Sequence, residues 1–144
     1  MDRGRERNIY FAGAIRGGRE DVRLYGELVS HLTGLGRVLT SHVADPRLDA
    51  AGDEGISEAA IYSRDMAWLD SADLVIAEVS TPSLGVGYEI AAAEARGKRI
   101  LCLFRSDAAH TLSAMIAGNP ALRIGHYSTL AEAKDHIARF FNEG

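Results

Sequence analysis

The sequence predicts an α/β fold in which a five-stranded, mostly parallel sheet carries helices on both faces. Short runs rich in β-branched and aromatic residues alternate with longer segments of helical periodicity, which is typical of parallel sheets. The run at residues 74–77 is continuously apolar, as expected for a buried strand. Right-handed crossovers then bring the C-terminal end of every strand to one edge of the sheet, where ligands of open α/β sheets bind.

The expected strands lie at residues 8–12, 38–40, 74–79, 99–104 and 122–124. The first helix spans about residues 19–35, because apolar side chains recur there at spacings of three and four and glycines follow. Ser57 is placed to cap a second helix that runs to about Asp70. A third helix follows the strand at 74–79 and ends near Gly97.

The remaining segments complete the predicted order. Residues 42–55 combine a proline, glycines and several acids, which favours a loop or lid. Residues 112–116 are a short helix, and Thr129 with Glu132 forms a capping box for the last helix. That helix carries Ile137, Phe140 and Phe141 on its apolar side.

Length and composition predict one domain. At 144 residues, with 47% hydrophobic and 25% charged residues, the chain is long enough to bury a core. We expect a flexible N-terminal tail at residues 1–7 and a single domain at 8–144. The net charge of -4 gives no footprint for nucleic acid.

The sequence also bears on the cellular setting. No apolar stretch approaches the ~20 residues of a membrane span, and no signal-peptide pattern is visible. The single Cys102 lies within an apolar strand-like run and is interpreted as a small buried hydrophobe. These features predict a cytoplasmic protein without a membrane partner.

The segment from Pro82 to Glu89 is the most informative part of the chain. It contains a serine, two glycines and a carboxylate at the point where a buried strand hands over to a helix. Ser83 and free backbone amides are suited to an anion at this edge. Glu89 has two interpretations: a nucleophile that attacks an electrophile, or a helix-start glutamate that complements the helix dipole.

A second candidate loop runs from Gly13 to Arg19. Its glycines allow close approach of a ligand, and Arg16 or Arg19 is able to contact phosphate. The loop is neither a Walker A motif nor the Gly-x-Gly-x-x-Gly fingerprint. A tight glycine-rich turn with solvated arginines remains the alternative.

Three more side chains are candidates. Asp65 interrupts the apolar stripe of its helix, so it is either a catalytic acid or a carboxylate bonded to backbone or to Arg64. Tyr10, near the C-terminal end of a central strand, either packs in the core or holds a carboxylate. Ser113, like Ser83, is either a helix cap or a ligand contact. The histidines show no metal-ligand spacing, so no metal or other cofactor is predicted.

The chain resembles the 2'-deoxynucleoside 5'-phosphate N-hydrolases of the nucleoside 2-deoxyribosyltransferase superfamily over roughly residues 8–141. The similarity starts at Ile9–Gly18 and is strongest at Ala77–Val79 with Pro82–Glu89, at Ile100–Arg105 and at Leu112–Ile116. Several segments match in the same order, which makes chance agreement a poor explanation. The resemblance implies a flavodoxin-like sheet, a homodimer, and hydrolysis of nucleoside 5'-monophosphates to free base and (deoxy)ribose 5-phosphate.

The resemblance also implies a role for each candidate. Glu89 is the nucleophile at the anomeric carbon, Asp65 contacts the sugar or assists proton transfer at the base, and Tyr10 orients Glu89. A nucleophilic carboxylate gives a covalent sugar intermediate that water opens. The implied substrate and phosphate contacts are Gly13, Ile15, Arg16, Gly17, Arg19, Ser83 and Gly85, with Ser113 reaching the site of the neighbouring subunit.

Ala14 departs from the family pattern, because serine is expected there in the vertebrate members. The change removes one hydroxyl and leaves the preferred base and sugar open. Three alternatives therefore stand beside the hydrolase: a deoxyribosyltransferase, a CMP-type ribonucleotide N-glycosidase, and a nucleotide-binding module without turnover.

Overall fold

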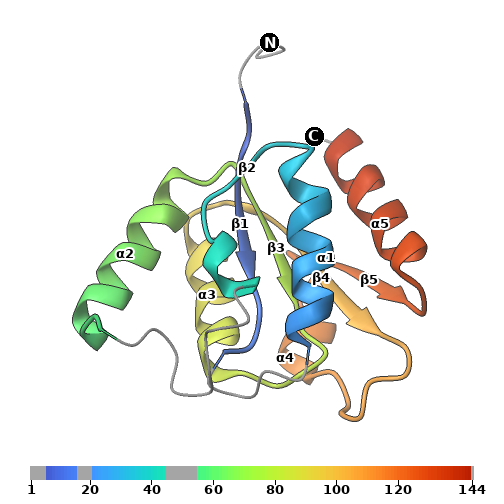
Figure 1. Cartoon of the computed structure of the whole chain (residues 1–144). Helices are drawn as coiled ribbons and strands as arrows, with labels where there is room; N and C mark the ends of the chain where they lie inside the picture. The colour runs from blue at the N-terminus through green and yellow to red at the C-terminus, as the bar shows by residue number, and fades with distance from the viewer. Residues whose placement is uncertain (1–5, 16–20, 45–54, 144) are drawn as a thin grey trace.

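A computed structural model describes residues 6–15, 21–44 and 55–143 of the chain (Figure 1). Within these residues five strands form one all-parallel sheet in the order β2-β1-β3-β4-β5. The elements, in chain order, are β1 (Asn8–Ala12), α1 (Val22–Thr33), β2 (Arg37–Val38), the 3-10 helix η1 (Ser41–Ala44), α2 (Glu58–Ser71), β3 (Leu74–Glu78), α3 (Leu84–Ala95), β4 (Arg99–Arg105), α4 (Ala114–Ala117), β5 (Arg123–Tyr127) and α5 (Leu130–Asn142).

The strand order fixes where a ligand can bind. The order 2-1-3-4-5 is that of flavodoxin-like sheets, in which the connections leave β1 and β3 in opposite directions and open a crevice at their C-terminal ends. The predicted fold class is therefore confirmed.

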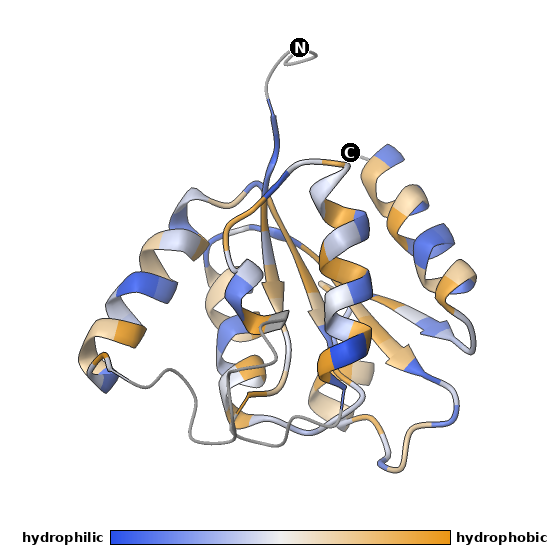
Figure 2. Cartoon of the chain, in the orientation of Figure 1, coloured by the Kyte–Doolittle hydropathy of each residue, from blue (hydrophilic) through white to orange (hydrophobic). Residues whose placement is uncertain are grey.

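Helices cover both faces of the sheet and give it two apolar layers (Figures 1 and 2). Ile9 and Phe11 of β1 point to the face that α1 and α5 cover, whereas Tyr10 and Ala12 point to the face under α2 and α3. This alternation follows from the two-residue period of a strand. It explains why the side chain of Tyr10 lies on the face of the sheet that α3 covers, where it is only 1% exposed.

Local signals placed most helix ends correctly. Ser57 accepts a hydrogen bond from the amide of Ala60, and Thr129 with Glu132 forms the expected capping box. Ile137 and Phe140 of α5 are buried, and Phe141 packs partly buried against the same core. The observed α4 starts at Ala114 rather than at 112.

Two edge strands differ from the prediction. β2 has only two residues, because Thr40 leaves the ladder: its hydroxyl accepts from the amide of Phe11 (2.8 Å) and donates to the carbonyl of Phe11 (2.6 Å). β5 extends to Tyr127, beyond the expected 122–124. Gly125 and His126 interrupt the apolar run there, so the sequence pattern ended too early.

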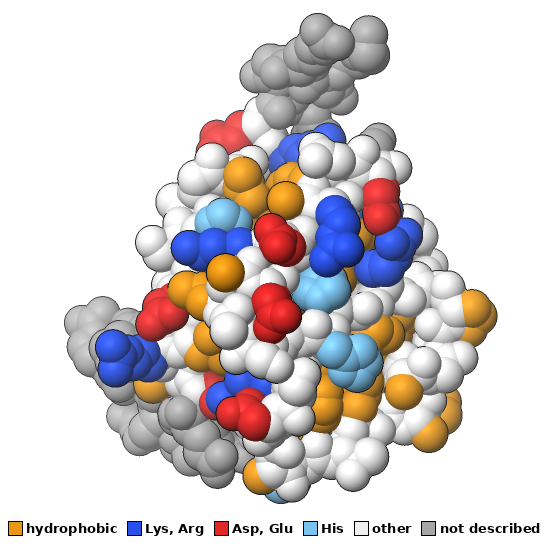
Figure 3. Space-filling view, turned by 90° about the vertical axis from the view of Figure 1, so that its right-hand side faces the viewer, with side chains coloured by type: hydrophobic (Ala, Val, Ile, Leu, Met, Phe, Trp, Pro, Cys, Tyr) orange, Lys and Arg blue, Asp and Glu red, His pale blue; other side chains and the backbone are white. Residues whose placement is uncertain are grey.

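The outer surface carries charges of both signs. On the side of the molecule that bears α5 and β5, acidic, basic and histidine side chains are interspersed (Figure 3). Arg7, which the sequence analysis assigned to the tail, lies over the ring of Phe141 and donates to its carbonyl oxygen. None of the helices in the described residues has the length and apolar character needed to cross a bilayer.

Candidate active site

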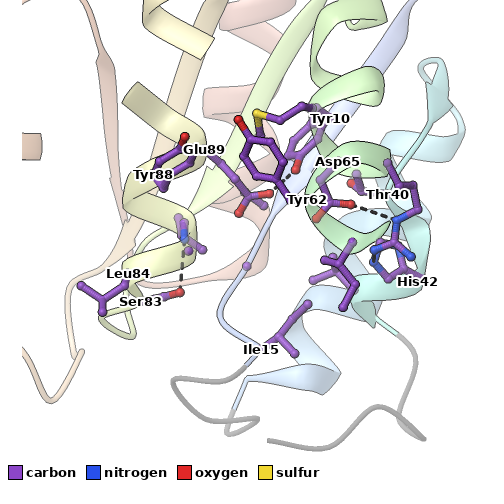
Figure 4. A pocket seen from close by; sticks show the side chains of 18 of the residues that line it. Tyr10, Ile15, Thr40, His42, Tyr62, Asp65, Ser83, Leu84, Tyr88 and Glu89 are labelled. Carbon is purple, nitrogen blue, oxygen red and sulfur yellow. Dashed lines mark hydrogen bonds and ion pairs between the residues drawn. The ribbon is translucent and has the colours of Figure 1, made fainter. Parts of the chain in front are cut away.

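A cavity of about 520 Å³ opens at the C-terminal edge of the sheet, between β1, α2 and α3 (Figure 4). It lies at the crevice that the strand order predicts. Its walls come from four parts of the chain that are distant in sequence: Tyr10, Ala12, Gly13, Ile15, Thr40, His42, Val43, Glu58, Ile61, Tyr62, Arg64, Asp65, Met66, Ser83, Leu84, Gly85, Val86, Tyr88 and Glu89.

Glu89 and Tyr10 form the central pair of this cavity. The Tyr10 hydroxyl donates a hydrogen bond to a carboxylate oxygen of Glu89 (Figure 4). Desolvation raises the pKa of Glu89 to about 7, the hydrogen bond from Tyr10 lowers it, and the charge of Asp65 raises it. Burial and the Glu89 charge hold the pKa of Tyr10 well above its ordinary value, so this phenol remains a proton donor to the carboxylate.

The position of Glu89 corrects one electrostatic expectation. Glu89 is in the second turn of α3, and the dipole at a helix start favours an ionised carboxylate. Removal from water nevertheless outweighs this effect and moves the pKa upward. A carboxylate with a pKa near 7 can act as a nucleophile when ionised and hold a proton when it is not.

Asp65 reaches the cavity from α2, opposite the Glu89 wall. Its carboxylate accepts from Arg64 (Nε to Oδ1, 3.0 Å), and both side chains are partly buried. The interpretation of Asp65 as a carboxylate bonded to Arg64 is therefore confirmed. Asp65 also lines the cavity, and its catalytic role stays a prediction. Arg64 continues to His42 (3.1 Å) and lies over the ring of Trp68 at 4.8 Å. Since a guanidinium only donates, Nε2 of His42 is the acceptor in this contact.

The serines serve as helix caps. Ser83 accepts from the amide of Val86 (3.2 Å) at the start of α3, and it also lines the cavity together with Gly85. Ser113 caps α4 by accepting from Met115 (3.2 Å). Ser113 is exposed and does not line the cavity of its own chain.

The described part of the loop after β1 is held from the core. A Cβ on Gly13 would lie 3.0 Å from the Tyr25 ring, so glycine permits this packing. The Tyr25 hydroxyl accepts from the amide of Ala14 (3.0 Å), and Ala14 is itself buried. Gly13 and Ile15 line the cavity, whereas Ala14 is not among its walls. The predicted contacts Arg16, Gly17 and Arg19 lie outside the described residues.

Part of the cavity wall was not expected from the sequence. The pairing of Arg64 with Asp65 was one of the expected alternatives and is confirmed. The contact of Arg64 with His42 was not expected, and neither was the contact of Tyr62 with Tyr88, whose ring centroids lie 6.3 Å apart at the cavity. For His42 a signal was available in the sequence, because it lies two residues after the end of the strand expected at residues 38–40. Among residues 6–15, 21–44 and 55–143, no group of His, Cys, Asp or Glu side chains is arranged to hold a metal ion.

Comparison with known proteins shows the family. Residues 9–134 match the family model described as nucleoside 2-deoxyribosyltransferase. The chain is 55% identical over 112 residues to a mouse protein named 5-hydroxymethyl-dUMP N-hydrolase, and the match covers 77% of this chain and 65% of that protein. It is 51% identical over 114 residues to the zebrafish protein of the same name, with 79% and 80% of the two chains covered.

A solved structure shows the same fold. The CMP N-glycosidase BcmB of Clostridium botulinum superposes with a TM-score of 0.66 at 18% identity, over 92% of this chain and 98% of that one. The family match spans the cavity residues from Tyr10 to Glu89 and continues through β4 and β5 into α5. The chain therefore belongs to the nucleoside 2-deoxyribosyltransferase family.

Proposed function

We propose that this protein hydrolyses the N-glycosidic bond of 2'-deoxynucleoside 5'-monophosphates, releasing the free base and 2-deoxyribose 5-phosphate. The observation that carries the proposal is the Tyr10–Glu89 pair, which faces the crevice cavity with Asp65 on the opposite wall. The names of the mouse and zebrafish relatives support the same reaction.

In the proposed first step, a Glu89 oxygen attacks the anomeric carbon as the bond to the base nitrogen breaks. The nitrogen takes the bonding pair and receives a proton, and a sugar ester of Glu89 forms. Tyr10 holds the attacking carboxylate in position. Asp65 contacts the sugar or assists the proton transfer to the base. Water then attacks the same carbon, Glu89 leaves, and the proton of the water is released.

The phosphate side of the site is assigned to the loop after β1 and to the start of α3. Gly13, Ile15, Ser83 and Gly85 line this end of the cavity. Contacts to a phosphate remote from the reacting carbon position the sugar and contribute to transition-state binding. This assignment favours a nucleotide over a nucleoside substrate.

We further propose a homodimer in which Ser113 reaches the neighbouring site. At the rim of the cavity α3 exposes apolar side chains: Leu84 is 97% exposed and Tyr88 is 57% exposed, and both also line the cavity, while Ala91 follows at helical spacing. Met115, next to Ser113, is 81% exposed. Burying such surface against a second copy is favourable, and Ser113 has no contact with its own cavity.

The first experiment measures free-base release by chromatography. The panel contains dNMPs, NMPs, 5-hydroxymethyl-dUMP and the matching nucleosides. Release from deoxynucleoside monophosphates alone supports the proposal. Activity on nucleosides that increases with an added acceptor base identifies a transferase, release from CMP alone identifies the ribonucleotide enzyme, and phosphate binding without turnover identifies a binding module.

A mixing experiment tests the shared site. Each proposed site uses Glu89 of one chain and Ser113 of the other, so a heterodimer of Glu89→Gln and Ser113→Ala subunits contains one complete site. Mixing the two variants is expected to restore a kcat/KM that neither has alone, because Glu89→Gln lacks the nucleophile and Ser113→Ala lacks the phosphate contact. Subunit exchange is checked by the co-purification of an untagged variant with an affinity-tagged one. No recovery in such an exchanged mixture would refute the contribution of Ser113 in trans.

A further inference from the structure

A second polar cluster lies at the same sheet edge, outside the cavity. Asp21, 6% exposed, occupies the N-cap position of α1 but makes no side-chain cap to that helix. Its carboxylate instead accepts from the Thr81 hydroxyl (2.9 Å) and pairs with Arg105 (NH1 to Oδ1, 2.9 Å). An aspartate at a helix start ordinarily accepts a hydrogen bond from its own helix. Asp21 instead uses its carboxylate oxygens for contacts with other parts of the chain.

The cluster extends across the sheet through Arg105. The backbone amide of Arg105 donates to the Ser80 hydroxyl (2.8 Å), which in turn donates to Glu78 (2.9 Å). Glu78, fully buried, also accepts from the Ser80 amide (2.8 Å) and from the Tyr127 hydroxyl. The ends of β3, β4 and β5 and the start of α1 are thereby joined by hydrogen bonds and one ion pair.

This arrangement connects the two segments that border the proposed phosphate end of the cavity. Asp21 immediately precedes α1, whose Tyr25 accepts a hydrogen bond from the amide of Ala14 next to Gly13, and Thr81 lies two residues before Ser83. The hydrogen bond between Asp21 and Thr81 therefore ties α1, which holds the start of the loop after β1, to the segment that leads into α3. Because Asp21 is almost completely removed from water, its charge acts over a longer range than that of a surface carboxylate.

The charge of Asp21 has a consequence for any anion that binds nearby. A phosphate group at this edge is repelled by an uncompensated buried carboxylate. Arg105 supplies the compensating charge, and it holds the carboxylate in the orientation that Thr81 requires.

We infer that Arg105 is a positioning residue for the 5'-phosphate: through Asp21 and Thr81 it fixes the spacing of the two phosphate-side segments, and it cancels the Asp21 charge beside them. Arg105 is not among the residues that line the cavity, so we assign it no direct contact with the phosphate. The inference rests on the proposed function. It adds to that function the residues that allow a doubly charged phosphate to bind at this end of the site.

The test compares Arg105→Met with the double variant Arg105→Met/Asp21→Asn. Loss of Arg105 alone is expected to raise the KM for the preferred monophosphate by about tenfold or more, with kcat within about threefold of wild type. Adding Asp21→Asn removes the repelling charge and is expected to return KM to within about threefold. Arg123→Met is the matched control, because Arg123 forms an exposed ion pair with Glu143 and is expected to leave KM unchanged.

Binding of 2-deoxyribose 5-phosphate, followed by calorimetry, provides a readout that does not depend on turnover. Weaker binding to Arg105→Met and recovery in the double variant support the inference. Equal binding to wild type and Arg105→Met, or equal loss in the single and double variants, overturns it. If wild type binds the sugar phosphate but releases no base, the proposed function fails while this comparison still stands. Thr81→Val offers a milder change should Arg105→Met not fold.

Discussion

The sheet edge holds two clusters that each contain a tyrosine, a glutamate, an aspartate and an arginine, in different surroundings. In the cavity, Tyr10 donates to Glu89, and a second carboxylate, Asp65, pairs with Arg64. In the buried cluster, Tyr127 donates to Glu78, and Asp21 pairs with Arg105. The two clusters differ in the number of other hydrogen bonds that each glutamate accepts.

The carboxylate of Glu78 accepts hydrogen bonds from several protein groups, whereas that of Glu89 has acceptor positions left for a ligand. Glu78 is 0% exposed and accepts from the Ser80 amide, the Ser80 hydroxyl and Tyr127. Within the described residues, Glu89 accepts from Tyr10 and faces the cavity. A carboxylate has about four acceptor sites, so Glu89 retains lone pairs that can attack or bind a substrate. The comparison teaches that burial with few partners, rather than burial alone, distinguishes the glutamate proposed to react from the structural one.

The largest expected effect separates the two glutamates by activity. Glu89→Gln removes the proposed nucleophile and is expected to lower kcat by roughly 10³-fold or more. Glu78→Gln places an amide donor against the Ser80 and Tyr127 donors and is expected to lower the free energy of unfolding by about 1–3 kcal/mol, with base release per folded molecule largely kept. Chromatographic base release and chemical denaturation measure the two effects. Turnover by Glu89→Gln close to wild type would contradict the nucleophile assignment.

Asp65 gives the next effect. Asp65→Asn keeps the size of the side chain but removes the carboxylate that faces the cavity, and it is expected to reduce kcat by roughly 10²-fold. The kinetic measurement is kcat and KM on the preferred monophosphate. Asp21→Asn is the paired change in the buried cluster, and an equal loss of kcat there would show that the two aspartates do not differ in role.

The tyrosines are expected to differ more modestly. Tyr10→Phe removes the hydrogen bond that lowers the pKa of Glu89, so that pKa rises further and less nucleophile is ionised at neutral pH. We expect kcat/KM at pH 7 to fall by roughly tenfold and the acidic limb of its pH profile to move to higher pH. Tyr127→Phe, which alters Glu78 instead, is expected to leave the position of that limb unchanged.

The smallest effect concerns stability and pH. The pKa of Glu89 is raised from 4.5 to about 7 in the folded protein, so the native state binds a proton that the unfolded chain releases between these values. The free energy of unfolding therefore falls, through this group, as pH rises from about 4.5 to 7. Glu89→Gln removes this penalty and is expected to stabilise the protein at pH 8 by on the order of 1–3 kcal/mol, measured by urea denaturation. A variant with the same pH dependence as wild type would show that Glu89 is not the titrating group.

Local sequence signals predicted the framework, because helix caps and apolar periodicity act within a few residues. Ser57 and Thr129 were identified as caps from their neighbours alone. Edge strands were less predictable: the side chain of Thr40 replaces a ladder contact with Phe11, and no pattern in the sequence records that exchange.

The candidate site depended on long-range contacts. The edge position of Tyr10 and Glu89 followed from the alternation of strands and helices, which left two interpretations open for each, and the family resemblance favoured the proposed catalytic ones. Arg64 adjoins Asp65 in sequence, yet its contacts with His42 and Trp68 form only in the folded chain. The cluster of Asp21, Thr81 and Arg105 joins three segments without a motif, so only the three-dimensional structure reveals it.

The hydrogen bond between Tyr10 and Glu89 closes a loop of 79 residues. Such a contact requires that distant parallel strands pair first, and non-local pairings of this kind are slow to form. β1 and α3 meet through the pairing of β1 with β3, so a chain with all its helices but an unpaired β1 has no assembled site. Recovery of turnover during refolding consequently times the docking of the first strand, an event that helix content measured by circular dichroism does not report.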